Sequence, residues 1–381
     1  MQKFNLNQYK TSNPYFTLFD VYFRDINANK ETLLKEMGIA PSSYRKCRRG
    51  ELHISEKIIE QISLYFHLKS CSEEIINELN DLTNNIYYDM YYKIEDSLEY
   101  YNSRLQTLKE EHYIIFPIID ILILFLKMNS TTDSNIVRNN NAELFEHVKK
   151  YNKFYEFGLT DLYEIICLFY DDDIPGNLWI KNYNNACAYH VLASRSHRNK
   201  RYIESLFFGN KAKEFLNEDG NIKRLLYINN ITMSNLIYVG NFEACYDLSF
   251  KQLLVLRSIA LNDSFMIRSA RKFKTISMLA LKYYNDIIEE YKLSTSLTVI
   301  EAICVMVSHY VIALNTNDYS QYNNLYNDII NSNFSKDDVL LIMSLNDYLS
   351  TKGKVSLNLA GLKNYEIIIH LEQIIKNIEI H

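Results

Sequence analysis

The sequence predicts an all-α protein. It contains only 9 Gly and 4 Pro among 381 residues, which disfavours a loop-rich or all-β fold. Apolar residues recur at helical spacing along most of the chain, and no stretch sustains the alternation of apolar and polar residues that a half-buried strand needs. Hydrophobic residues make up 48% of the chain, enough for large cores, and the length favours two or three domains.

The first domain is expected to span residues 1–70. Its first helix is predicted from Pro14 to Phe23, and its last over residues 55–68 with Ser55 as N-cap. The core candidates of the first helix are Phe16, Phe19, Val21 and Phe23. Those of the last helix are Ile58, Ile59, Ile62, Leu64, Tyr65 and Phe66.

Residues 32–50 predict two short helices joined by a tight turn. Gly38 stands just past the end of the first helix, a position that glycine often takes. Pro41 suits the first turn of the second helix, because the N–H that proline lacks would have no partner there. Gly50 ends the second helix. The apolar stripe of the first helix consists of Leu33, Leu34 and Met37.

The second of these helices carries hydroxyl groups at its N-terminal end and cations along its length. Small donors can meet base edges and cations can neutralise phosphates, so this chemistry is typical of a DNA-recognition helix. The candidate DNA-binding residues are Ser42, Ser43, Tyr44, Arg45, Lys46, Arg48 and Arg49. The alternative interpretation is a basic amphipathic hairpin on an all-helical surface.

This segment resembles the helix-turn-helix of the Cro and phage-repressor type. The positions that match its pattern are Leu33, Gly38, Ile39, Ser42, Tyr44, Arg48 and Gly50. The chain departs from the pattern at Thr32-Leu33, where Gln-Glu or Gln-Ala is usual, and at Arg48-Arg49, near which a Glu often stands. Residues 1–70 contain 11 Lys and Arg against 7 Asp and Glu, whereas the whole chain has 41 against 46. A basic head on an acidic body fits a nucleic-acid-binding module attached to a part that does not bind nucleic acid. With the helix-turn-helix resemblance, the expected partner is a double-stranded DNA operator.

Residues 71–110 are expected to form a connecting helix, because residues 72–105 contain neither Pro nor Gly. The apolar run from Tyr113 to Met128 is 16 residues long, shorter than the roughly 20 that span a membrane, so a buried helix is expected. Residues 1–10 lack the apolar core of a signal peptide. Six isolated cysteines suit a reducing compartment, so we expect a cytoplasmic protein without a membrane partner.

A sequence repeat appears at an offset of 40 residues, between segments 200–212 and 240–252. In each segment an aromatic residue is followed by two small or polar ones. These are Tyr202, Ser205 and Ala212 in the first segment, and Phe242, Cys245 and Gln252 in the second. The pattern resembles the second helix of a tetratricopeptide repeat, and Leu192-Ala193 resembles the Leu-Gly pair of its first helix. The resemblance implies an α-solenoid over residues 111–381, with 263–291 and 297–330 as further repeats. A generic helical bundle is the alternative.

Most motifs for catalysis, for a metal or for a cofactor are absent from the sequence, and a formal Ser-x-x-Lys match at Ser43 and Lys46 lacks its supporting elements. Zinc-ligand spacings and phosphate-binding glycine loops are absent, so no enzyme is expected. Asp171–Asp173 could hold a cation, but an acidic surface turn is favoured.

In a tetratricopeptide register, the first helix of each pair lines the concave face. Asn side chains both donate and accept, so they can bracket the backbone of an extended peptide, and a basic cluster could capture a carboxylate. The candidate peptide-binding residues are Asn185, His190, Ser194, His197, Tyr227, Asn229, Asn230, Ser234, Arg268, Arg271 and Lys274.

As a whole, the chain resembles the peptide-pheromone receptors of the Rap/Rgg/NprR/PlcR/PrgX group, which includes the phage arbitrium receptors. The resemblance implies a homodimeric transcription regulator that binds a palindromic operator and is switched by a short signalling peptide. It also implies that Asn230, with Asn185 and Asn229, holds the peptide backbone. Residues 330–381 would cap the solenoid or form the dimer contact. The alternative is a protein-binding repeat scaffold of the response-regulator inhibitor type, without DNA-binding activity.

Overall fold

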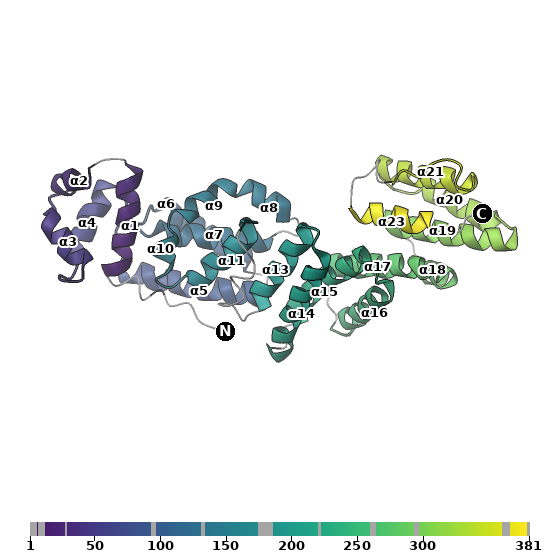
Figure 1. Ribbon diagram of the computed structural model, residues 1–381, viewed down its shortest axis with the longest axis horizontal. Helices are drawn as coiled ribbons and strands as arrows, with labels where there is room; N and C mark the ends of the chain where they lie inside the picture. Colours follow the sequence, from purple (N-terminus) through teal and green to yellow (C-terminus); the bar gives the residue numbers. More distant parts are fainter. Residues whose placement is uncertain are drawn as a thin grey trace. The chain divides into compact units, whose positions relative to one another are not determined.

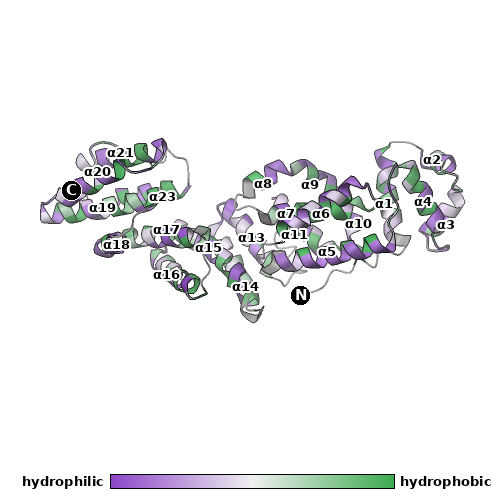
Figure 2. Cartoon of the chain, turned by 180° about the vertical axis from the view of Figure 1, so that it is seen from behind, coloured by the Kyte–Doolittle hydropathy of each residue, from purple (hydrophilic) through white to green (hydrophobic). Residues whose placement is uncertain are grey.

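The computed structural model describes residues 6, 12–26, 29–92, 97–130, 134–173, 186–219, 222–259, 264–292, 297–359 and 366–378. Within these residues the chain forms α-helices and no β-strand, apart from one isolated bridge between Lys69 and Tyr113 (Figure 1). The all-α prediction is confirmed. Most helices carry both hydrophobic and hydrophilic residues along their length, as amphipathic helices do (Figure 2).

The chain divides into two compact units. Unit 1 comprises Met1–Arg195 and Lys211–Arg224, and unit 2 comprises Ser196–Asn210 and Leu225–His381. The expected domain boundaries at residues 70 and 110 therefore do not coincide with the boundary between these units.

Unit 1 contains the predicted head, residues 12–68, and the helices that follow it. Its helices are α1 (Ser12–Asp25), α2 (Lys30–Glu36), α3 (Pro41–Arg48), α4 (Glu56–Tyr65), α5 (Glu73–Tyr92), α6 (Leu98–Glu110), α7 (Phe116–Ser130), α8 (Ser134–Asn140), α9 (Ala142–Lys149), α10 (Asn152–Tyr155) and α11 (Thr160–Tyr170).

The head confirms half of the predicted core, and Ile58, Ile59 and Phe66 are half-buried. The four core candidates of α1 are all buried, as is Ile62 of α4. Leu64 and Tyr65 were expected in the core, but their side chains are 72% and 36% exposed. Two or three residues beyond Ile62, the helix has turned their side chains away from its buried face. Ser55 occupies the N-cap position of α4 without a capping hydrogen bond from its side chain.

Helix α1 packs on two sides. On one side, the Tyr44 ring of α3 lies 6.0 Å from the Phe23 ring, edge to face. On the other, the buried Tyr22 hydroxyl donates a 2.7 Å hydrogen bond to the Ile114 carbonyl, and its ring lies 6.4 Å from that of Tyr151. The head is therefore joined to the next helices through a packed helix.

The prediction of a single connecting helix over residues 71–110 is wrong. Residues 71–110 contribute two helices, α5 and α6, and both pack against α7. Arg104 of α6 also pairs with Glu78 of α5, Nη2 to Oε2 at 2.8 Å. These helices are part of the core of unit 1, because their apolar stripes need the apolar surface of α7 as a partner.

Helix α7 confirms the prediction of a buried apolar helix over residues 113–128. Nearly all its side chains from Ile118 to Leu126 are inaccessible to solvent. Its one carboxylate, Asp120, is 3% exposed and accepts a 2.7 Å hydrogen bond from the Lys109 ammonium, with the His147 Nε2 atom at 3.5 Å. These partners compensate the cost of burying a charge.

Unit 2 is built mainly from helix pairs. Its helices are α16 (Phe242–Ser258), α17 (Ser264–Ala280), α18 (Tyr284–Tyr291), α19 (Val299–Thr316), α20 (Ser320–Ile330), α21 (Lys336–Ser350) and α23 (Glu366–Lys376). Three further helices contribute residues to both units: α13 (Ala186–Arg198), α14 (Tyr202–Asp219) and α15 (Ile222–Tyr238).

The same turn recurs between the helices of successive pairs. Lys200, Gly240 and Lys282 adopt positive φ values of 58°, 76° and 63°. In each turn the next residue donates its N–H to the carbonyl five residues earlier, as Asn241 does to Leu236 at 2.9 Å. This Schellman-type closure ends one helix and starts the next. The expected repeats at 263–291 and 297–330 are indeed helix pairs, α17/α18 and α19/α20.

Small side chains line the second helices of these pairs where they were predicted. Ser205 and Cys245 are buried. A Cβ atom added at Gly209 would lie 3.4 Å from the Thr232 Oγ1 atom, so α14 and α15 approach closely there. This helical repeat is compatible with tetratricopeptide-like content.

Helix α19 is the apolar centre of unit 2. Among the described residues it alone is long and apolar enough to cross a membrane, but 67% of it is buried by the rest of the protein. It packs against α17, α18, α20 and α21. The core helix of a soluble protein is buried in this way.

We predict that Tyr22→Phe lowers the free energy of unfolding by about 1 kcal/mol, because the buried Ile114 carbonyl loses its hydroxyl donor. Chemical denaturation monitored by circular dichroism measures the change. The matched variant Tyr65→Phe removes an exposed hydroxyl contact with Glu36 and should change stability by much less. Equal effects of the two substitutions would contradict the role given to Tyr22.

We predict that Glu164→Gln stabilises the protein above pH 7. One carboxylate oxygen of Glu164 is buried without a hydrogen bond, and burial, reinforced by Asp161, raises the pKa of Glu164 to about 7. The folded state therefore disfavours the ionised form, and this destabilisation develops as pH rises from about 4.5 to 7. Because the group is partly screened by solvent, the gain should be about 1 kcal/mol at pH 8 and close to zero below pH 5.

Urea unfolding at both pH values measures this difference. Glu156→Gln, at an exposed position, is the control and should show no gain at either pH. A gain for Glu164→Gln that did not depend on pH would contradict the explanation.

Candidate functional site

The candidate recognition helix α3 is shaped by the residues around it. Gly38, at φ = 72°, and Gly50, at φ = 75°, occupy the left-handed region before and after the helix. Pro41 is its first residue, as predicted. The helix contacts both α1 and α2. The local sequence thus fixes where α3 begins and ends, and the head core fixes how it is oriented.

One face of α3 belongs to the core. Tyr44 is only 1% exposed, and its ring lies 5.2 Å from that of Phe16 and 4.5 Å from the Lys30 ammonium. Its hydroxyl is also buried. The prediction of Tyr44 as a DNA-binding residue is therefore corrected, because the side chain points into the head and anchors α3.

The opposite face of α3 is open to solvent. Ser42, Arg45, Lys46, Arg48 and Arg49 are exposed and Ser43 is half-buried. Three of the arginines have acidic partners: Arg45 with Glu31 at 3.1 Å, Arg48 with Asp20 at 3.0 Å, and Arg49 with Glu51 at 3.7 Å. Exposed ion pairs of this kind contribute little to stability, so an external anion can replace the acidic partner at small cost.

The predicted peptide-binding residues of unit 1 are Asn185, His190 and Ser194. His190 is half-buried, with its Nδ1 atom 3.0 Å from Nη1 of Arg224, and Ser194 is half-buried. Asn185 lies outside the described residues. His190 is thus engaged by a buried arginine of its own unit.

In unit 2, His197 is part of an internal hydrogen-bond network. Its Nδ1 atom lies 2.7 Å from the Asn235 amide oxygen, and the Asn235 amide nitrogen donates to Ser205 at 2.7 Å. Its ring stacks on that of Tyr238, which in turn lies 4.7 Å from the ring of His370 on α23. Burial lowers the pKa of His197. His197 thus links α13 to α15, and Tyr238 continues the contact to α23. The peptide-binding role of His197 stays a prediction.

Asn230 is also engaged within the protein. Its amide oxygen accepts a 2.9 Å hydrogen bond from Gln252, and its amide nitrogen lies 2.8 Å from the Met266 sulfur. Tyr227 packs on an apolar cluster that includes Met266. The residue predicted to hold a peptide backbone therefore links α15 to α16 and α17.

The predicted basic cluster on α17 is largely neutralised. The Arg271 Nε atom lies 3.0 Å from Glu301, which is 2% exposed, and the Lys274 ammonium lies 2.6 Å from Glu290. Arg268 is exposed. Glu301 also accepts from the Tyr291 hydroxyl at 3.1 Å, so removing Arg271 would disturb a buried network.

Among the predicted residues of unit 2, Asn229 and Ser234 remain half-buried and Arg268 remains exposed. The Ser234 hydroxyl also has an internal partner, the Tyr238 hydroxyl. Arg268 is therefore the predicted residue of unit 2 that is most open to a ligand. Within unit 2, His197, Asn230, Arg271 and Lys274 are each engaged by a partner inside the repeat.

Sequence reasoning missed the buried amide of Asn235. The signal was present, since Asn235 continues a buried stripe with Ile228 and Thr232 at helical spacing. A polar residue in such a stripe indicates an internal hydrogen-bond partner. Asp20, which pairs with both Arg48 and Lys30, gave no comparable signal because its partners lie on other helices.

The acidic turn after α11 is an ion-paired surface turn. Asp171 lies 3.4 Å from the Lys149 ammonium, and Asp172 lies 2.7 Å from Arg138. Across the described part of the chain, no group of three His, Cys, Asp or Glu residues is placed to hold a metal ion. Burial raises the pKa of the thiols of Cys71, Cys167 and Cys245 to about 12, which keeps them protonated and weakly nucleophilic.

Comparison of the chain with protein-family models, with curated proteins and with solved structures finds no match.

We predict that Asn235→Ala lowers the free energy of unfolding by about 2 kcal/mol, because His197 and Ser205 both lose a buried partner. Asn229→Ala, six residues earlier on the same helix, should change stability by less than about 0.5 kcal/mol. Thermal and chemical denaturation of the two variants provide the comparison. Equal losses of stability in the two variants would contradict the structural role given to the Asn235 amide.

Proposed function

We propose that this protein is a DNA-binding transcriptional regulator. The single observation that carries the proposal is the division of α3 into two faces: Tyr44 and Cys47 are buried in the head, and a row of hydroxyls and cations is exposed. An anchored helix with such a face can enter the major groove with a fixed orientation. In this role Arg45, Lys46 and Arg49 face the DNA, and Ser42 and Ser43 lie at the N-terminal end of the helix.

We further propose that the regulator is a cytoplasmic homodimer controlled by a short signalling peptide bound to the helical repeat. The proposal is supported by the recurring helix pairs, and by Asn229, Ser234 and Arg268, which retain access to solvent. Peptide binding would favour one arrangement of the two DNA-binding heads over another. A switch from 1:99 to 99:1 between arrangements requires a difference in peptide affinity of about 5.5 kcal/mol.

A protein-binding scaffold without DNA-binding activity is the second candidate function. It is favoured by apolar side chains exposed on the second helices of two pairs. Ile203 and Phe207 on α14 are 77% and 53% exposed, and Phe250 and Leu254 on α16 are 43% and 46% exposed. Exposed apolar residues that gather on one element often mark a protein contact. In the regulator such a contact would be made with the second copy of the chain.

The experiment that separates these functions is selection of genomic DNA fragments by the purified protein. We predict that the protein enriches a few palindromic sites and that Arg45→Ala/Arg49→Ala does not. Each lost contact should cost about 1–3 kcal/mol, so the double variant should bind its site roughly 30-fold to 30,000-fold more weakly. Far-UV circular dichroism should be unchanged, because both side chains are exposed.

The control for this experiment is Lys251→Ala/Arg257→Ala, which removes two exposed cations from α16. This variant should retain DNA binding. Normal binding by the α3 variant would exclude α3 as the recognition helix. Recovery of one dominant protein partner, with no DNA enriched in the presence or absence of candidate peptides, would favour the scaffold.

A further inference from the structure

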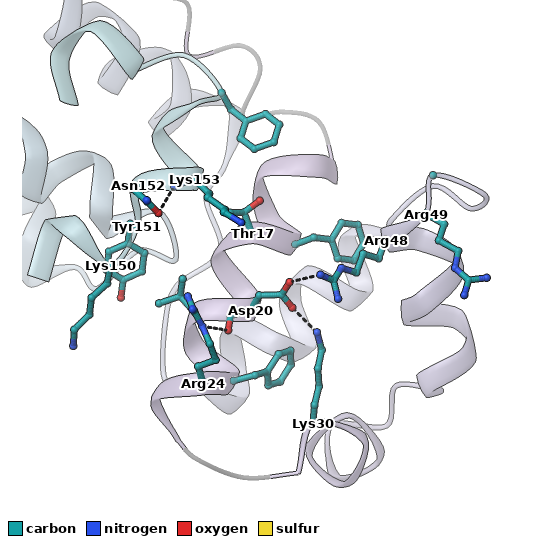
Figure 3. Close-up of a pocket in the computed structure, with 15 residues that line it drawn as sticks. Thr17, Asp20, Arg24, Lys30, Arg48, Arg49, Lys150, Tyr151, Asn152 and Lys153 are labelled. Carbon is teal, nitrogen blue, oxygen red and sulfur yellow. Dashed lines mark hydrogen bonds and ion pairs between the residues drawn. The ribbon is translucent and has the colours of Figure 1, made fainter. Parts of the chain in front are cut away.

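A large groove lies beside the C-terminal end of α3, within unit 1. It has a volume of ≈ 1020 Å³ and is lined by α1, by the start of α2, by the end of α3 and by residues 150–157 (Figure 3). Its two walls therefore come from the predicted head and from the segment around α10. None of this was expected from the sequence, since the walls lie 100 residues apart along the chain.

The groove carries a strong excess of positive charge. Its charged side chains are Arg24, Lys30, Arg48, Arg49, Lys150 and Lys153, against a single carboxylate, Asp20. Asp20 pairs with Lys30 and Arg48, which both point towards it in Figure 3. Arg49 also has an acidic partner, Glu51, at 3.7 Å. Two carboxylates compensate only part of the charge of six cations. The remaining cations favour an external anion.

The cations are arranged for a polyanion. Arg24, Arg49, Lys150 and Lys153 are all exposed, so they line an open surface. Such side chains suit phosphates that stay partly hydrated, as those of a nucleic-acid backbone do. Arg48 and Arg49 are also the last residues of the recognition-helix segment, so the groove continues the surface that would face DNA.

The two lysines are held in place relative to α3. Lys150 and Lys153 flank Tyr151, which is 2% exposed and whose ring packs against Tyr22 of α1 and, 5.6 Å away, against Phe116. Helix α10 contacts α1 directly. Because α1 also carries the contacts to Tyr44, the same helix positions both walls of the groove.

We infer that Lys150 and Lys153 bind backbone phosphates of the DNA duplex whose bases face α3. This inference rests on the proposed function and extends it: the DNA-binding surface consists of the head together with the segment around α10. These lysines contribute affinity without reading sequence, because phosphate contacts carry no direct sequence information.

The test is the salt dependence of DNA binding by the full-length protein and by Lys150→Gln/Lys153→Gln. Two probes are used, a selected genomic site and a random-sequence duplex of the same length. Each lost phosphate contact lowers the slope of log K against log salt by about 0.9, so the slope should fall by roughly 2 on both duplexes. The ratio of specific to non-specific affinity should stay the same. The matched control, Lys251→Gln/Lys354→Gln, removes two exposed cations from unit 2 and should leave the slope unchanged.

The possible failures are distinguishable. Equal slopes for the groove variant and the unmodified protein, with sequence-specific binding intact, would overturn this inference alone. The slope could fall for the variant on both duplexes while the unmodified protein shows no preference for either sequence. This result would support the phosphate contacts and contradict the proposed function as a sequence-specific regulator. Stabilisation by inorganic pyrophosphate combined with equal slopes would assign the groove to a small anion and overturn the inference. Failure of the unmodified protein to bind any duplex would overturn both proposals.

Discussion

The packing of helix α1 on both its sides is the constraint on which unit 1 depends. Phe23 and its neighbours hold Tyr44 of α3, and Tyr22 holds Tyr151 and the Ile114 carbonyl. Aromatic pairs of this kind contribute about 0.5–1.5 kcal/mol each beyond the burial of their area. A change in the orientation of α3 relative to residues 114–155 would have to break several of these contacts together.

This constraint bears on how a regulator built from this chain would be controlled. The head is not tethered by a flexible linker, because its first helix is also part of the contact with α10. A signal received in unit 2 would therefore act on unit 1 as a body, by changing the distance or angle between two copies of it. The basic groove fits this view, since its walls would approach DNA together.

The helical repeat uses most of its polar residues for its own stability. Asn235 connects His197 and Ser205, and Glu301 connects Arg271 and Tyr291. Buried polar groups require such partners, because an unpaired one costs about 1–3 kcal/mol. The side chains that remain accessible on the first helices are fewer than the sequence pattern indicates. Of the predicted binding residues in unit 2, Arg268 is exposed and Asn229 is half-buried.

The sequence by itself determined the helical fold and the start and end of α3. These depend on local interactions: the φ angles that Gly38 and Gly50 accept, the missing N–H of Pro41, and apolar spacing along each helix. Only the tertiary structure decided that Tyr44 is a core residue, that Asn230 and Arg271 serve internal partners, and that Lys150 and Lys153 line the same groove as Arg48 and Arg49. Side-chain pairing depends on residues far apart in the chain, and a single sequence contains no record of which of them meet.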